Sequence, residues 1–363
     1  MAPTPRQVVP TLTPKERAGM APTPRQIVPT LTPKERAGMA GFAPQGHLTY
    51  HNGPLLTAVE VVTIFWGGAW AQPPQSGLIP QLNRFFDFIL ASSLIDLLGE
   101  YSVPGKAIGH GKRIGTSTII TSEPGGGSGQ VSDAQIQQAL QGWIASGTIP
   151  QTTSNTLYFV YLPPGVTCVL GSDQSCQIFC GYHSHINGTI FYAVEPFITC
   201  DGCSFGQILD SLTKVSSHEL CEAITDPALN AWFDDTPPHN EIGDICNATV
   251  QQLGGYTIQL EWSNRANACL LSPPQQVLVH FNNVITGVGG YYATDDNTQH
   301  AIVGTSDGNL TEVYWKPAQG VHQGVLAHFG NPIVGVGGYY AADDNSRHAI
   351  VGTNDGTLAE IQW

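Results

Sequence analysis

The stretch that most restricts the fold of this chain is residues 205–225, which has the spacing of a long amphipathic helix. At 100° per residue it carries an apolar stripe made of Ile208, Leu212 and Val215. His218 and Glu222 continue that stripe one turn apart, and Glu219 lies beside them. The helix must therefore bury a polar cluster together with its apolar face, so the fold has to supply partners for buried carboxylates.

These three residues form an incomplete version of the H-E-x-x-H pattern of zinc hydrolases, because Glu222 replaces the second histidine. We predict that His218 and Glu222 are metal ligands and that Glu219 is the general base. Glu241, which lies 23 residues after His218, is the predicted third ligand. The predicted cofactor is Zn²⁺, which lowers the pKa of a water ligand toward ~7. The predicted reaction is hydrolysis of an amide or a related bond.

Other assignments stay open at this point. One histidine and two carboxylates are a hard ligand set that also suits Ca²⁺ or Mn²⁺. The alternative ligands are His183, His185, His239, Asp226 and Asp244. The competing structural interpretation makes Glu219 and Glu222 solvated helix residues and makes Asp226 a cap of the following turn. The inward-facing stripe favours a metal, since the sequence offers few Lys or Arg residues nearby to pair with the acids.

The charge balance restricts the partners. The net charge is −14, and charged residues make up 12% of the chain, about half the usual globular share. Nucleic acid is excluded as a partner on this ground. No apolar run reaches the length of a membrane span, and no signal-peptide core is visible at the N-terminus.

The cysteines point to an oxidising compartment. The chain has eight of them, all between residues 168 and 269. An even number of clustered cysteines favours disulfide bonds. The rival is a zinc site that includes Cys200 and Cys203, whose C-x-x-C spacing suits a metal, but no second C-x-x-C follows.

Alternating element types before this helix predict a layered α/β (α+β) domain. Buried strands are expected at residues 59–66, 114–121, 156–162 and 189–195. Helices are expected at 78–98, with a break at the Ser92-Ser93 pair, and from Ser132, which forms a capping box with Gln135.

Two internal repeats flank this domain. Residues 2–20 and 21–39 repeat one 19-residue proline-rich unit and differ only at Val8 and Ile27, so residues 1–45 are predicted to be a disordered tail. Residues 277–315 and 325–363 repeat with a 48-residue period and agree at 27 of 39 positions. Their short strands and Asp-Gly turns predict an all-β region of two propeller-blade-like units, similar to blades of propeller lectins. Their tyrosines and tryptophans mostly fill the blade core in this interpretation.

Six segments occur in an order that resembles the exordium/phosphate-induced protein family, at residues 51–57, 61–67, 180–183, 218–227, 230–234 and 241–246. The resemblance covers residues 46–272. It implies an extracellular or cell-wall protein with disulfides, and it carries over to His183, His218, Glu219, Glu222, Asp226, Glu241 and Asp244. It implies no settled activity for the family.

The sequence therefore supports two hypotheses. The first is a secreted zinc-dependent hydrolase of peptidase type, with a zincin-like domain over residues 46–272 and a β-repeat binding appendage over 277–363. The alternative is a non-catalytic extracellular protein that binds cell-wall or surface glycans, with a structural metal or acidic cluster. In both, the C-terminal repeats are candidates for homo-oligomer contacts, because two blades do not close a propeller.

Overall fold

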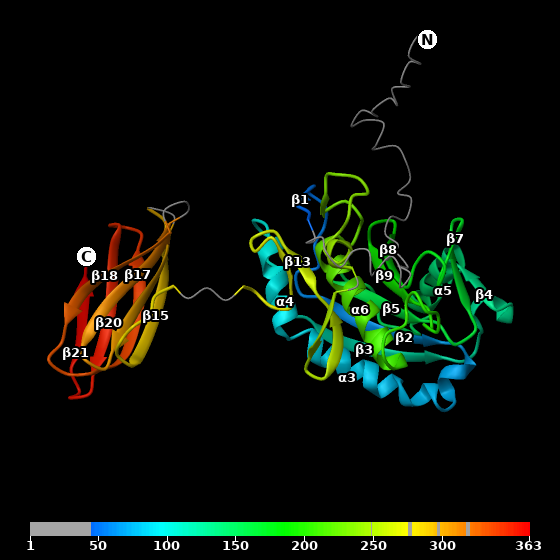
Figure 1. Cartoon of the computed structure of the whole chain (residues 1–363), viewed down its shortest axis with the longest axis horizontal. Helices are drawn as coiled ribbons and strands as arrows, with labels where there is room; N and C mark the ends of the chain where they lie inside the picture. The colour runs from blue at the N-terminus through cyan, green and yellow to red at the C-terminus, as the bar shows by residue number, and fades with distance from the viewer. Residues whose placement is uncertain (1–44, 248, 275–277, 296–297, 317–319) are drawn as a thin grey trace, which may run out of the picture. The chain divides into compact units, whose positions relative to one another are not determined.

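The described residues of the chain fall into two compact units, which divide between residues 274 and 275 (Figure 1). The computed structural model describes residues 45–247, 249–274, 278–295, 298–316 and 320–363. Of the predicted disordered tail, residues 1–44 therefore lie outside the described part of the chain. None of the described helices is long and apolar enough to cross a membrane.

A five-stranded sheet forms the centre of the first unit. Its order is β3 (Lys112–Ile119), β2 (Glu60–Trp66), β5 (Thr156–Tyr161), β9 (Ile190–Glu195) and β8 (Tyr182–Ile186). The first four strands are parallel, and β8 runs antiparallel to β9. Strand β8 was not predicted, because its five residues contain two histidines and a serine and form no apolar run.

Helices cover both faces of this sheet. One face packs against α3 (Ile79–Ile89), α4 (Ser93–Leu98) and α6 (Ile208–Thr225). The other face packs against α5 (Asp133–Ala145). Alternate residues of β5 enter the two cores, with Leu157 and Phe159 on the α6 side and Tyr158 and Val160 on the α5 side.

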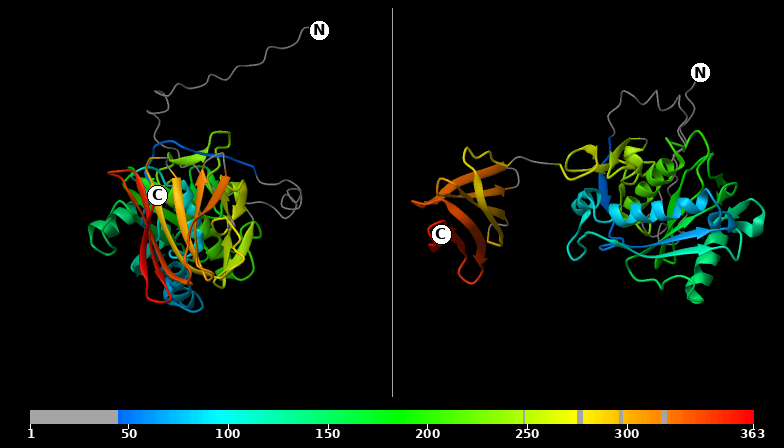
Figure 2. Two further views of the ribbon diagram at one scale, coloured as in Figure 1. Left: turned by 90° about the vertical axis from the view of Figure 1, so that its left-hand side faces the viewer. Right: turned by 90° about the horizontal axis from the view of Figure 1, so that it is seen from below.

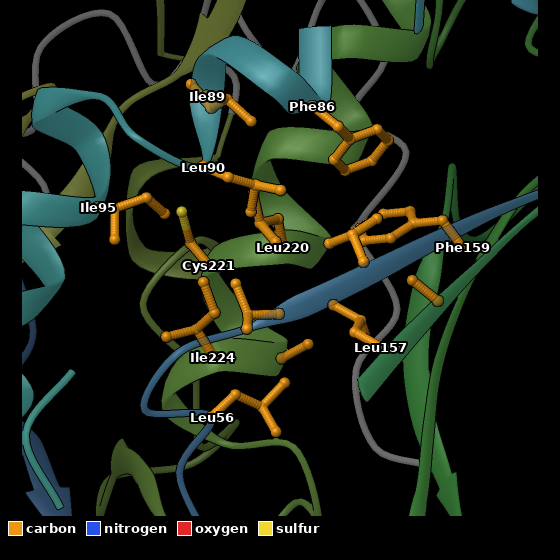
Figure 3. Close-up of a cluster of buried hydrophobic side chains, with 14 of the residues drawn as sticks. Leu56, Phe86, Ile89, Leu90, Ile95, Leu157, Phe159, Leu220, Cys221 and Ile224 are labelled. Atoms are coloured by element: carbon orange, nitrogen blue, oxygen red, sulfur yellow. The ribbon is translucent and has the colours of Figure 1, made fainter. Parts of the chain in front are cut away.

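The packing of α6 is visible in the core itself (Figure 3). Leu220 of α6 lies beside Leu90 and near Phe159 of β5, and Ile224 lies beside Leu56; all five belong to one buried cluster. The break in the predicted helix at Ser92 is also present, since the Ser92 hydroxyl caps α4 by accepting the Leu94 N–H at 3.3 Å.

The remaining elements of this unit are short. The pairs are β1 (Leu48–Tyr50) with β10 (Trp232–Asp234), β11 (Val250–Leu253) with β12 (Tyr256–Gln259), and β13 (Glu261–Ser263) with β14 (Ala268–Leu270). A further sheet contains β4 (Gln130–Ser132), β6 (Thr167–Leu170) and β7 (Asp173–Gln174). Single 3₁₀ turns are η1 (Gly68–Ala71), η2 (Gln75–Gly77), η3 (Gly99–Tyr101), η4 (Pro124–Gly127) and η5 (Asp244–Cys246).

The second unit consists of two antiparallel sheets (Figure 2). The first holds β15 (Ile285–Ala293), β16 (Thr298–Thr305), β17 (Asn309–Lys316) and β18 (Gly320–His328). The second holds β19 (Ile333–Ala341), β20 (Ser346–Thr353) and β21 (Leu358–Gln362). Glycines let β15 approach β19 closely, because a Cβ on Gly289 would lie 2.8 Å from the nitrogen of Gly338. The assignment of these sheets to propeller blades stays a prediction.

Each repeat holds one tyrosine, one histidine and one glutamate in contact. Tyr291 stacks on His300, with ring centroids 4.8 Å apart, and both bond to Glu312. In the second repeat Tyr339 stacks on His348, and both bond to Glu360. These contacts explain why the tyrosine and histidine recur, and they agree with a structural role for the two histidines.

We expect Leu220→Ala to lower the free energy of unfolding of the first unit by about 3 kcal/mol, because the side chain is 0% exposed and its removal leaves a cavity. Ile120→Ala serves as the control, since Ile120 is 55% exposed and should cost no more than about 0.5 kcal/mol. Urea unfolding followed by circular dichroism measures both. Equal costs for the two variants would contradict the packing of α6 described above.

Candidate metal centre

The C-terminal half of α6 carries the predicted motif into the interior. His218, Glu219 and Glu222 are each at most 1% exposed. Two glycines on neighbouring segments make room for them. A Cβ on Gly243 would lie 2.5 Å from Nδ1 of His218, and one on Gly181 would lie 3.2 Å from Oε1 of Glu219. The motif is therefore buried, as the helical projection indicated, and a side chain at either glycine would crowd it.

A first group of ligand atoms lies around His218. Its Nε2 is 3.1 Å from Oε1 of Glu222 and 4.0 Å from Oδ1 of Asp244. One ligand atom from each of the three residues lies within 4.8 Å of the others. Asp244 begins η5 and is held in place because its Oδ2 accepts the backbone N–H of Glu241 at 3.1 Å. Three donors from two segments thus converge on one point.

A second group lies around His183, which β8 places opposite α6. Nδ1 of His183 is 3.4 Å from Oε2 of Glu219 and 3.5 Å from Oε2 of Glu222. These three residues also form a set within 4.8 Å, and all are buried. Glu222 belongs to both groups, with Oε1 toward His218 and Oε2 toward His183.

Each histidine is oriented through its other ring nitrogen. Nε2 of His183 lies 3.2 Å from the carbonyl oxygen of Asp226 and donates to it, so Nδ1 is the ring nitrogen that faces Glu219 and Glu222. Nδ1 of His218 is 2.6 Å from the Gln259 carboxamide. The Gln259 atom at that distance is Nε2, which also donates to the carbonyl oxygen of Gly243 at 2.9 Å, so Gln259 fixes the orientation of the His218 ring.

Glu241, the predicted third ligand, lies on the far side of His183. Its Oε2 is 3.8 Å from Nε2 of His183, and the nearby Asp226 carboxylate contributes to its raised pKa. The structure brings Asp244, and not Glu241, within 4.8 Å of His218 and Glu222 in the described part of the chain. Both acids remain within the same buried cluster.

The other alternative ligands, Asp226, His185 and His239, make contacts with residues close to them in the sequence. Oδ1 of Asp226 accepts the backbone N–H groups of Asn230 and Ala231, so Asp226 caps the turn after α6. Nδ1 of His185 accepts the N–H of Gly188 in the β8–β9 turn. His239 lies against Phe233, with Nδ1 3.0 Å from the carbonyl of Asp234.

Three residues of this cluster were not predicted. Glu195 ends β9 beside Tyr161, Glu261 lies in β13, and Gln259 ends β12; all three are 0% exposed. Glu195 and Glu261 are single acids at the end of apolar or half-apolar strands. That position is the sequence signal that could have identified them, since a lone acid in such a strand needs a buried partner.

The cluster has more acceptors than donors. Among the described residues, both carboxylate oxygens of Glu195, Glu219, Glu222, Glu241 and Glu261 are buried without a hydrogen-bond partner, as are Nδ1 of His183, Nε2 of His218 and Oδ1 of Asp244. Unpaired buried carboxylates are costly unless they are protonated or bind a cation. The nitrogen and oxygen atoms present therefore fit a divalent cation.

The pKa values follow from the same arrangement. Burial raises the pKa of Asp244, the charge of Glu222 raises it further, and it reaches about 8. Burial also raises the pKa of Glu219, and it holds those of Glu241 and Glu261 well above their usual range. Burial thus favours the protonated form of each of these acids.

In two groups at the centre, by contrast, the neighbours stabilise the charged form. Burial disfavours the charged form of His183, but its contacts with Glu219 and Glu222 raise its pKa to about 10. Burial likewise opposes ionisation of Glu222, but His218 and His183 lower its pKa to about 2. Glu222 is thus the carboxylate that stays ionised, as expected for a residue between two positive groups.

The prediction of disulfide bonds is confirmed for six of the eight cysteines. The pairs are Cys176–Cys200, Cys180–Cys203 and Cys246–Cys269. Cys200 and Cys203 are therefore both in disulfides, and Cys168 and Cys221 are buried free thiols. Three disulfides fit an extracellular protein.

Two of these bonds anchor segments of the cluster. Cys180 lies three residues before His183, and its partner Cys203 precedes α6. Cys246 lies two residues after Asp244 and is bonded to Cys269 in β14. Loop residues that face α6 are thus tied covalently to neighbouring elements.

The comparisons with known proteins place the sequence near one family. No family model matches it. It is similar to Protein EXORDIUM-like 5 of Arabidopsis thaliana, with 24% identity over 260 residues, which are 58% of this chain and 66% of that protein. The chain thus spans just under two thirds of that relative's length. The match supports the resemblance to the exordium family.

We expect replacement of Cys246 and Cys269 by serine to lower the free energy of unfolding by about 3 kcal/mol, because the bond closes a loop with a sequence separation of 23. The same change should weaken Zn²⁺ binding, since it releases the segment that carries Asp244. Urea unfolding and isothermal titration calorimetry measure the two effects.

The matched control replaces Cys176 and Cys200 by serine. This bond has a sequence separation of 24, so its loss should cost a similar stability, but neither cysteine lies within three residues of a ligand candidate. Equal losses of Zn²⁺ affinity in both double variants would show that the Cys246–Cys269 bond has no special role at the cluster.

Proposed function

We propose that this protein is a secreted, metal-dependent hydrolase with a zincin-like catalytic domain and a β-repeat binding appendage. The observation that carries the proposal is the convergence of Nε2 of His218 and Nδ1 of His183 on buried carboxylate oxygens without hydrogen-bond partners. Zinc is the proposed cofactor, and Ca²⁺ is the alternative. The three disulfides support the extracellular location.

In this proposal His218 and Glu222 hold the cation, with Asp244 or Glu241 as the third ligand. A divalent cation in such a site polarises a carbonyl group and makes a nucleophile of water near neutral pH. Glu219 accepts the proton of the attacking water, because its two oxygens are unpaired and it lies next to the metal ligands in α6. The Gln259 carboxamide orients His218. The proposed substrate is a peptide or a related amide.

A second candidate function rests on two other observations. The ligand atoms are completely buried, which suits a structural cation better than one that meets a substrate. In addition, the second unit has a groove of about 370 Å³ lined by Asn283, Asp307, Asn309 and Gln323, among others. Amides and carboxylates are groups that bond to sugar hydroxyls. The alternative is therefore a non-catalytic extracellular protein that binds glycans of a cell wall or surface.

We expect the purified full chain to contain stoichiometric Zn²⁺, and Glu222→Ala to lose it, because Glu222 faces both histidines. Elemental analysis for Zn, Ca and Mn after desalting measures the content. Asp201→Ala, at an exposed acid, is the control and should keep the metal. Absence of metal from the wild-type chain would exclude the metal site.

We expect Glu219→Gln to keep at least one Zn²⁺ but to lower the hydrolysis of a fluorogenic peptide library by roughly 10²–10⁴-fold, the usual contribution of a general base. Unchanged hydrolysis would exclude Glu219 as the base. If the wild-type chain hydrolyses no peptide, binding of the full chain to a glycan array tests the alternative, and Gln323→Ala, in the groove, should reduce that binding.

A further inference from the structure

We infer that this centre binds two divalent cations rather than one, with Glu222 as the residue that bridges them. The first position is formed by His218, Glu222 and Asp244, and the second by His183, Glu219 and Glu222. The inference rests on the proposed function, since it takes the first cation from there. It gives Glu219 a new role as a ligand in place of that of the base.

The two oxygens of Glu222 point to different histidines. Oε1 is 3.1 Å from Nε2 of His218, and Oε2 is 3.5 Å from Nδ1 of His183. A carboxylate can use one oxygen for each of two neighbouring cations. A one-cation site gives no reason for Glu222 to face two imidazoles, whereas a bridging role needs both contacts.

The two cation positions share only the Glu222 carboxylate, and their other ligands are separate. Each contains one imidazole nitrogen and one private acid, which is Asp244 in the first position and Glu219 in the second. In each histidine the nitrogen that faces the acids lacks a hydrogen-bond partner, and the other nitrogen is held by Asp226 or Gln259. Secondary contacts of this kind orient a metal-binding histidine, and here both histidines have one.

The charge of the interior also calls for more than one cation. Seven buried carboxyl groups belong to the cluster or interact with it electrostatically: Glu195, Glu219, Glu222, Asp226, Glu241, Asp244 and Glu261. One divalent cation offsets two negative charges, and two divalent cations offset four. Because buried uncompensated charge is costly, a second cation lowers the free-energy cost of burying this group of acids.

Two adjacent cations change the kind of reaction that the site supports. Paired metals hold both the attacking and the leaving oxygen of a displacement reaction. The substrate class that follows is a hydrolysable ester, whose leaving oxygen would contact one cation while the attacking oxygen would contact the other.

The test is the number of cations bound by the full chain. Metal-free protein is loaded with Zn²⁺, desalted and analysed for zinc per chain. A parallel sample loaded with Mn²⁺ is examined by electron paramagnetic resonance, because two Mn²⁺ ions bridged by one carboxylate couple their spins. We expect two Zn²⁺ per chain and a coupled Mn²⁺ spectrum for the wild-type chain and for Asp201→Ala.

The variants separate the two positions. His183→Ala and Glu219→Gln should each lose the second position, bind one Zn²⁺ and give an uncoupled Mn²⁺ spectrum. Asp244→Asn should lose the first position instead, with the same two results. Circular dichroism checks that each variant is folded. If a variant is unfolded, the wild-type Mn²⁺ spectrum decides by itself.

One Zn²⁺ per wild-type chain with an uncoupled Mn²⁺ spectrum would overturn the second position and leave the proposed function standing. A Glu219→Gln chain that keeps two cations would overturn the ligand role of Glu219. No bound cation in the wild-type chain would overturn both the two-cation centre and the metal-dependent function.

Discussion

The burial of ionisable side chains at the C-terminal end of α6 is the constraint on which the first unit depends. The helix must cover the sheet with Leu212, Leu220 and Ile224, and the same rotation carries His218, Glu219 and Glu222 inward. A buried carboxylate costs several kcal/mol unless a proton, a cation or hydrogen bonds compensate it. The surrounding segments therefore have to bring compensating groups to this helix.

Two structural features around α6 supply these groups, namely strand β8 and the segment that follows β10. The antiparallel strand β8 turns back along β9 and sets His183 against the helix. The segment after β10 supplies Glu241 and Asp244, and the Cys246–Cys269 bond ties it to β14. A short edge strand and disulfide-anchored loops hold side chains more firmly than free loops, which suits a site whose donors must stay close despite their mutual repulsion.

The sheets of the second unit pack in a different way from those of the first. Its two sheets approach through glycines of β15 and β19, so packing there depends on small residues as well as on the buried apolar cluster that contains Ile302 and Ile333. The recurring Tyr–His–Glu contacts stiffen each repeat at equivalent positions. This construction leaves polar side chains such as Asn283 and Gln323 to line its groove, which is why a binding role suits this unit better than a catalytic one.

The sequence by itself determined the local structure and half of the centre. Helical periodicity set the inward face of α6 and so identified His218, Glu219 and Glu222, and the clustered cysteines indicated disulfides, because both signals depend only on neighbours along the chain. Only the tertiary structure brought His183 and Asp244 to Glu222 and buried Glu195, Glu261 and Gln259 beside them. Those contacts join residues from separate strands and loops, and their pairing is decided by sheet order and disulfide partners, which no local pattern encodes.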